Sequence, residues 1–137
     1  MTFPCAGIIV FNGDKTILVS TERGNHSFPK GKREKSESDL EAAWRELGEE
    51  TGLTSDEVQL INGVHFDELS NKGFPSVRYF VGHLTRAPVN GFTFDHTELA
   101  EVKWYPITEV LQMDRLKGQR KEILEKAYTA YRAFRTL

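Results

Sequence analysis

The stretch GKREKSESDLEAAWRELGEETGL, residues 31–53, predicts a loop followed by a helix. Apolar residues recur at i, i+3, i+4 and i+7, the spacing of one helical face, as Leu40, Ala43, Trp44 and Leu47. Ser38 and Glu41 have the spacing of a capping box, and Gly52 suits the position that ends a helix. The stretch therefore predicts a helix over residues 38–51, with its apolar stripe against a core.

The same helix carries three glutamates on one narrow arc, opposite the Leu40/Leu47 stripe. Glu46, Glu49 and Glu50 are spaced i, i+3 and i+4. Arg45 is placed to pair with Glu49, but no cation stands one helical turn from Glu46 or Glu50. Because like charges at this spacing repel, the arc favours an external cation, and ligands that are all oxygen suit Mg²⁺ or Mn²⁺. A solvated acidic face is the alternative.

Nine positions of this stretch fit the pattern G-x5-E-x7-R-E-U-x-E-E-x-G-U, in which U is aliphatic: Gly31, Glu37, Arg45, Glu46, Leu47, Glu49, Glu50, Gly52 and Leu53. The pattern resembles the catalytic box of the Nudix hydrolase family. This resemblance implies an α/β fold, an α/β/α sandwich with a mixed central sheet and a loop-helix-loop box. It also implies Mg²⁺-dependent hydrolysis of a nucleoside diphosphate linked to another group, by attack of water on phosphorus.

The resemblance also assigns roles. Carried over by position, the metal ligands are Gly31, through its backbone carbonyl, and Glu46, Glu49, Glu50 and Glu98. Glu37 and Arg45 are expected to form a pair that shapes the loop and orients the ligands. Glu98 is the first candidate for the base that activates water, with Glu101 second and Glu49 a third possibility; an ordinary solvent-facing acid is the alternative for Glu98. The catalytic set is thus Glu49, Glu98 and Arg45.

Just before the box, the run HSFPKGK at residues 26–32 looks like the W-x-F-P-K-G-K segment of diadenosine polyphosphate hydrolases, diphosphoinositol polyphosphate phosphohydrolases and mRNA decapping enzymes. Its cations, with the next residue, are predicted to hold a phosphate chain: Lys30, Lys32 and Arg33. Its ring at His26 is a candidate for stacking on adenine, as are the rings of Phe66 and Tyr79, although core packing is the commoner role for a tyrosine in a strand.

The run Leu116–Leu124 and the strand residues around Tyr79 extend the resemblance to diadenosine tetraphosphate hydrolases, which release ATP and AMP. That substrate is the first expectation. Diphosphoinositol polyphosphate hydrolysis and other nucleotide or cap pyrophosphatase activities are the enzymatic alternatives. A Nudix-like module that binds a nucleotide without cleaving it is the alternative from another class.

The rest of the chain predicts a sheet covered by a second helix. Residues 6–11 and 16–20 read as a β-hairpin around the turn at Asn12-Gly13, and a loop spans residues 21–35. Further strands are expected over residues 58–66, 77–84 and 102–105, with a helix beginning near Pro106. An amphipathic helix follows from the spacing of Ile123, Leu124, Ala127, Tyr128, Tyr131 and Phe134. Glycine is unfavourable inside a helix, and nothing in the sequence explains Gly48 there, so we expect a close backbone contact at this position.

Length and charge set the limits on function. The chain has 137 residues, which predicts a single domain over residues 1–137. Its formal charge of -2 argues against a stable nucleic-acid partner held through bulk positive charge and favours a small nucleoside polyphosphate. The single Cys5 and the lack of an apolar run of membrane-spanning length predict a cytoplasmic protein without a membrane partner. A monomer or a homodimer is compatible with the sequence.

Overall fold

The N-terminal hairpin is confirmed, and its two strands separate soon after the turn. A computed structural model of the chain describes residues 3–88, 91–116 and 118–136. Strands β1 (Cys5–Asn12) and β2 (Lys15–Ser20) are antiparallel but pair only at Phe11↔Thr16 and Asn12↔Lys15. Beyond these pairs, β1 and β2 find other partners.

Two short strands occupy the space between the separating strands. β4 (Lys30–Lys32) pairs with the start of β1, and β3 (His26–Ser27) pairs with the end of β2. The prediction of a loop over residues 21–35 is therefore wrong in part, because strands of two and three residues are too short to show a hydrophobic period. The pairing of β4 with β1 fixes Gly31 opposite Ala6, which places the start of the Nudix-like pattern on the sheet.

The sheet is mixed. β6 (Pro75–Leu84) runs parallel to β1, β5 (Val58–Leu69) is antiparallel to β6, and β7 (Glu101–Pro106) is antiparallel to β2. The strand order is β3-β2-β1-β6-β5, with β4 on β1 and β7 on β2. Each of the three later strands was expected, and β5 and β6 are longer than their apolar runs because they continue into the hairpin that joins them.

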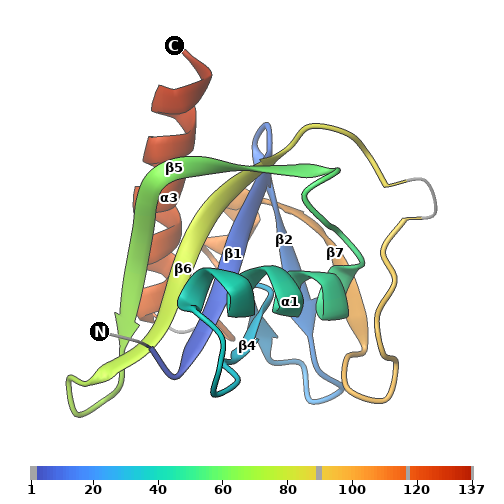
Figure 1. Cartoon of the computed structure of the whole chain (residues 1–137). Coiled ribbons are helices and arrows are strands. Elements are labelled where there is room, and N and C mark those ends of the chain that lie inside the picture. The colour runs from blue at the N-terminus through green and yellow to red at the C-terminus, as the bar shows by residue number, and fades with distance from the viewer. Residues whose placement is uncertain (1–2, 89–90, 117, 137) are drawn as a thin grey trace.

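Helices cover both faces of this sheet, so the predicted α/β/α sandwich is confirmed (Figure 1). α1 (Asp39–Thr51) covers one face, and α3 (Gly118–Arg135) with the short α2 (Ile107–Val110) covers the other. Along β1, Ile8 and Val10 pack with the α1 cluster, whereas Ile9 and Phe11 pack with the α3 cluster. This alternation follows from the two-residue period of a strand. Lys117, within the sequence run noted above, lies outside the described residues.

The apolar face of α1 differs from the predicted stripe. Ser38 caps the helix in a capping box with Glu41, and Gly52 ends it with φ 81°, as expected. Leu40, however, is 38% exposed, and the residues that the helix buries are Asp39, Ala42, Ala43, Leu47 and Thr51. Small alanines let the helix lie close to β1, and Asp39 is satisfied by the backbone N–H of Phe3 at 3.1 Å. The buried face is thus rotated from the predicted one.

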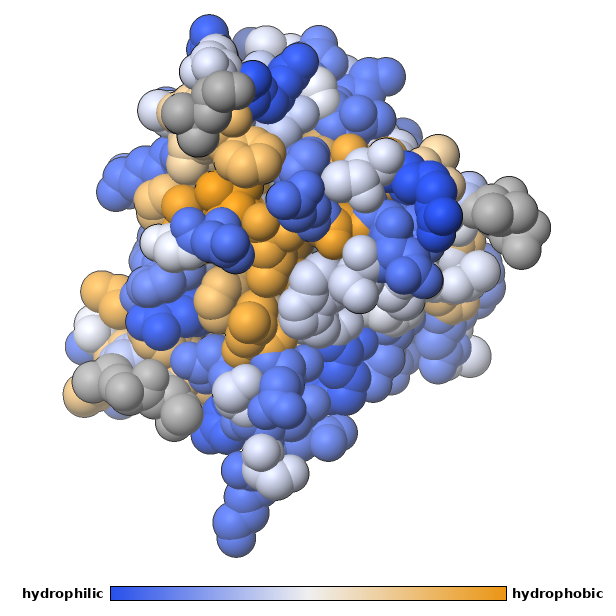
Figure 2. Space-filling model, turned by 45° about the horizontal axis from the view of Figure 1, so that its top comes forward, coloured by the Kyte–Doolittle hydropathy of each residue, from blue (hydrophilic) through white to orange (hydrophobic). Residues whose placement is uncertain are grey.

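The outer surface is mostly polar. On the face in Figure 2, an apolar band is bordered on both sides by hydrophilic residues. The large apolar side chains that the described residues expose are Leu40, Leu69 and Phe74. In the part of the chain that the structure describes, none of the helices has both the length and the apolar character that a membrane span requires.

Candidate functional site

The start of β4 and the second half of α1 meet at two of the three helical glutamates. Gly31 faces the Glu46 carboxylate so closely that a Cβ at this position would overlap it. The backbone N–H of Lys30 donates to Oε1 of Glu50 at 2.9 Å. Glu46 and Glu50 therefore point toward β4, on the flank of the buried face, and not opposite the core as the helical arc predicted.

Burial gives Glu50 an unusual protonation equilibrium. The pKa of Glu50 is raised to about 7, chiefly because burial desolvates the carboxylate; the hydrogen bond from Lys30 opposes this shift, and the charges of Glu46 and Glu98 add to it. Burial and the charge of Glu49 likewise raise the pKa of Glu46. These carboxylates repel one another, and a bound divalent cation would relieve that repulsion.

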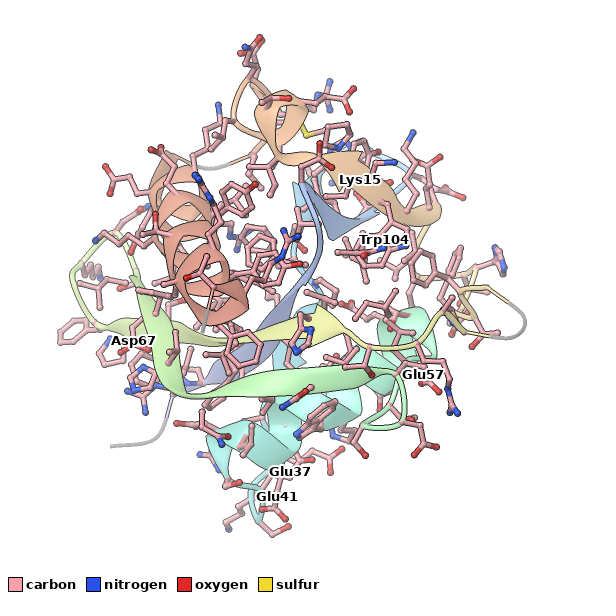
Figure 3. All side chains as sticks on the ribbon, turned by 90° about the horizontal axis from the view of Figure 1, so that it is seen from above. Lys15, Glu37, Glu41, Glu57, Asp67 and Trp104 are labelled. Atoms are coloured by element: carbon pink, nitrogen blue, oxygen red, sulfur yellow. The ribbon has the colours of Figure 1, made fainter. Side chains whose placement is uncertain are left out.

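Arg45 organises the other acids. Its Nε donates to Oε2 of Glu37 at 2.7 Å, and its Nη2 donates to the carbonyl of Lys32 at 2.8 Å. Its Nη1 donates to Glu46 at 3.0 Å and to Glu49 at 3.1 Å. The expected pairing of Glu37 with Arg45 is confirmed, and it ties the loop before α1 to the helix. Figure 3 shows Glu37 beside Glu41 at one end of α1, away from α3.

Glu46 thus has a cationic partner that the sequence reasoning missed. The expectation that no cation balances Glu46 considered only residues one helical turn away, whereas Arg45 is its immediate neighbour in the chain. The long guanidinium stem lets one side chain reach both sides of the helical arc. Hydrogen bonds to Glu37 and the glutamates raise the pKa of Arg45 above its ordinary value, and the bond from Arg45 lowers the pKa of Glu37.

The donor set fits a hard divalent cation in its chemistry. All side chains predicted as ligands offer carboxylate oxygens, the atoms that Mg²⁺ and Mn²⁺ prefer. Among residues 3–88, 91–116 and 118–136, no three acidic, histidine or cysteine side chains already converge as a metal site. Glu46 and Glu49 are instead turned to Arg45, while Glu50 forms no ion pair with a described side chain. Arg45 contacts Oε1 of each of these two carboxylates, so Oε2 of each is the oxygen that it leaves for a cation.

The two candidate bases outside the box have different surroundings. Glu98 is exposed, in the loop before β7, and its charge acts on Glu50. Glu101 accepts a hydrogen bond from the Tyr105 hydroxyl at 3.1 Å and lies 3.7 Å from Nζ of Lys103. The fold therefore brings Glu98 toward the helical glutamates, whereas Glu101 contacts Tyr105 and Lys103.

A cavity of about 490 Å³ adjoins these acids where β1 and β2 have separated. Its lining includes His26 and Lys30 from the short strands, Glu50 from α1, and Arg115 and Arg120 from the C-terminal region. Two of the residues predicted to bind substrate, His26 and Lys30, are thus brought together with Glu50. Sequence reasoning missed Arg115, and it noted Arg120 only as part of a resembling run, because no local pattern links residues 115–120 to residues 26–50.

Four of the predicted substrate-binding residues are placed elsewhere. Arg33 donates to the backbone carbonyls of Phe3, Glu34, Lys35 and Glu37, so its guanidinium braces the loop. Tyr79 is fully buried, with its ring against Phe28, and cannot stack on a base. Phe66 is half-buried and packs against the core cluster on the α3 face of the sheet. Lys32 is exposed on β4 and is not among the lining residues.

Comparisons with known proteins agree with this architecture. The family profile described as NUDIX domain matches residues 1–127. The chain is 36% identical over 62 residues to an RNA pyrophosphohydrolase of Roseobacter denitrificans, and 42% identical over 60 residues to one of Halorhodospira halophila. Each match covers 42% of this chain. The matched regions make up 39% of the Roseobacter protein and 33% of the Halorhodospira protein, so the chain matches only about a third of the length of these relatives.

The structural comparison concerns the fold. A crystal structure of a C. elegans Ap4A hydrolase binary complex superposes with a TM-score of 0.80 at 20% sequence identity, covering 94% of this chain and 98% of that one. At this identity the likeness establishes a common fold and leaves the substrate open.

Proposed function

The chain belongs to the NUDIX family of hydrolases, and from this we propose that it hydrolyses a pyrophosphate bond, with diadenosine tetraphosphate as substrate and ATP and AMP as products. The observation that carries the proposal is the position of Glu46 and Glu50 against β4, beside a cavity that also holds Lys30 and two arginines. Such a cavity offers oxygen ligands for a cation and donors for phosphate within one site.

Each group at the site has a task in that reaction. Mg²⁺ or Mn²⁺ held by Glu46, Glu49, Glu50 and the Gly31 carbonyl would neutralise charge on the phosphate oxygens as water displaces the leaving group. Lys30 lines the cavity, where its ammonium can hold a phosphate oxygen. Glu98, which is exposed and close enough to act on Glu50, is the base proposed to take the proton from water, with Glu49 as the alternative. Arg45 positions Glu46 and Glu49 rather than contacting phosphate.

A substrate panel with product identification tests this proposal. Diadenosine tetraphosphate, a diphosphoinositol polyphosphate, nucleoside triphosphates and 5′-triphosphate or capped RNA are incubated with the protein and Mg²⁺, and the products are separated. ATP and AMP as the dominant products would support the proposal. Cleavage of another member would reassign the substrate, and tight nucleotide binding without any hydrolysis would support the non-catalytic module.

The 5′ end of RNA is the second candidate substrate. It is favoured by the two RNA pyrophosphohydrolases that share 36% and 42% identity over regions of about sixty residues. The chemistry at phosphorus is the same, but a polynucleotide needs a basic surface beyond the cavity, and the chain has a formal charge of -2. We therefore rank it below the dinucleotide.

A cytoplasmic location and a monomeric or homodimeric state remain predictions from the sequence.

A further inference from the structure

Two arginines in the cavity are not explained by the metal-binding pattern. Arg115 lies between α2 and α3, and Arg120 lies in the first turn of α3, on the side of the sheet opposite α1. Both line the cavity that also contains Lys30 and Glu50. The C-terminal region therefore contributes guanidinium groups to a site whose acids come from α1.

Arg120 is held rigidly at the cavity wall. Its side chain is 9% exposed, and its Nε and Nη2 donate to the two oxygens of Glu68 at 2.7 and 3.3 Å. The Tyr79 hydroxyl donates to the same carboxylate at 3.4 Å. The Tyr79 hydroxyl also interacts with the guanidinium of Arg120, and Nη1 is the nitrogen that the two bonds to Glu68 do not use. The two hydrogen bonds to Glu68 thus fix the plane of the guanidinium and leave one nitrogen for a ligand.

Stability alone is a weak explanation for this pair. Burying two charges costs desolvation free energy, and replacement of a buried ion pair by apolar residues of similar size is often neutral or stabilising. Glu68 and Arg120 are 4% and 7% exposed, among the few charged residues that the described core buries. A planar donor fixed at the wall of a cavity is, in contrast, suited to the oxygens of a phosphate.

Arg115 approaches the same cavity from another segment. Its Nη1 donates to the carbonyl of Arg23 at 2.6 Å, which links the region before α3 to the turn after β2. With Lys30 and Arg120, three cationic side chains line the cavity beside one lining carboxylate, Glu50, and Glu68 behind the lining neutralises Arg120. The charges of Lys30 and Arg115, together with the donors of the paired Arg120, suit a ligand with several adjacent negative groups.

We propose that Arg120, oriented by Glu68, is a specificity-determining residue that donates a hydrogen bond to the polyphosphate chain of the substrate, beyond the phosphates held at α1. This inference rests on the proposed function, and it explains how the site distinguishes a long phosphate chain from a short one. Glu68 is a positioning residue, because it acts through Arg120.

Kinetics and ligand binding with three variants test the inference. In Arg120→Met, KM for diadenosine tetraphosphate should rise about tenfold or more while kcat changes less than about threefold, because a charge-assisted hydrogen bond to bound substrate is lost. Glu68→Gln should raise KM in the same direction. Arg132→Met, the matched control, changes an exposed arginine of the same helix outside the cavity and should leave both constants unchanged.

A second readout separates this inference from the proposed function. Binding of inorganic triphosphate, measured by calorimetry without substrate turnover, should weaken about tenfold in Arg120→Met and not in Arg132→Met. If the wild-type protein cleaves none of the panel, the proposed function fails, while the triphosphate titration still tests Arg120. The double variant Arg120→Met/Glu68→Leu leaves no unpaired buried charge and replaces Arg120→Met should that variant unfold. Wild-type KM and wild-type triphosphate affinity in the variants would overturn the inference.

Discussion

Gly31 and Gly48 stand in the same motif but have different surroundings. A Cβ at Gly31 would occupy the space of the Glu46 carboxylate, whereas the nearest atom to a Cβ at Gly48 is the carbonyl oxygen of Leu53 at 3.8 Å. We expect Gly31→Ala to push Glu46 aside and to reduce kcat at least about tenfold, with a small change in melting temperature because a flexible side chain can move. Steady-state kinetics and thermal denaturation measure both effects.

Gly48→Ala is the matched control for that variant. The expectation of a close backbone contact at Gly48 is wrong, since 3.8 Å is an ordinary contact distance. Alanine in a helix interior is favoured over glycine by about 1 kcal/mol, so this variant should be more stable than the wild type and retain its activity. A loss of activity as large as that of Gly31→Ala would show that the motif responds to any added methyl group.

Glu50 should destabilise the metal-free protein at alkaline pH. Its pKa is raised to about 7 in the folded chain from an ordinary value of 4.5, so the folded state binds the proton more tightly. The resulting stabilisation is present below pH 4.5 and is lost as the pH rises through 7. We expect the melting temperature of Glu50→Gln, relative to wild type, to increase between pH 5 and pH 8, as followed by circular dichroism.

Removing the Glu50 carboxylate should stabilise the metal-free protein but weaken metal binding and hydrolysis. Mn²⁺ or Mg²⁺ should raise the melting temperature of the wild type more than that of Glu50→Gln, and both Glu50→Gln and Glu49→Gln should reduce hydrolysis at least about a hundredfold. Near wild-type rates in both variants would remove the metal-site interpretation. An equal stabilisation by metal in wild type and Glu50→Gln would exclude Glu50 as a ligand.

The residues of the box could be predicted because their order and spacing along the chain are unusual. The role of Arg33 could not, because side-chain spacing does not reveal that backbone carbonyls bind its guanidinium, whereas core packing was already the commoner role expected of Tyr79. Arg33 was expected to bind phosphate from its position beside two lysines, yet backbone carbonyls occupy its donors. Arg120 acquires its orientation from Glu68, 52 positions away. A single sequence does not show such pairings.

At the level of elements, α3 is joined to the sheet through an aromatic cluster that contains a histidine. His83 on β6 packs against the rings of Tyr131 and Phe134, and its buried Nε2 has no hydrogen-bond partner among the described residues. Burial lowers the pKa of His83 from its ordinary value of 6.5. The helices and the longer strands could be predicted from periodicity, but this docking contact required the three-dimensional structure.

Protonation of His83 should therefore loosen the α3 contact. Because the pKa of His83 is lower in the folded state, the unfolded chain binds more protons below pH 6.5, and stability falls as the pH decreases from there. We expect His83→Leu to have a smaller loss of melting temperature between pH 7 and pH 5 than the wild type. The pH profile of His83→Leu is compared directly with that of the wild type, and identical profiles for the two proteins would contradict this interpretation of the contact.

At the level of the whole molecule, a formal charge of -2 must be reconciled with a highly anionic substrate. The sheet resolves the conflict, because the separation of β1 and β2 opens a cavity that gathers Lys30, Arg115 and Arg120 while most acids stay outside it. The overall charge could be read from the sequence, but this segregation could not, since Lys30 lies far along the chain from Arg115 and Arg120. We therefore expect attraction of the proposed substrate to be a local effect of the cavity.

A local effect makes a specific prediction about salt. The distance over which charges act falls from about 10 Å at 0.1 M to about 3 Å at 1 M ionic strength, so added salt weakens attraction by the cavity before it weakens contacts within the bound complex. We expect KM for diadenosine tetraphosphate to rise several-fold between 0.1 and 0.5 M NaCl at nearly constant kcat, and Arg115→Met to reduce that dependence. Arg135→Met changes the net charge equally but lies outside the cavity. An equal reduction in both variants would show that net charge, and not the cavity, attracts the substrate.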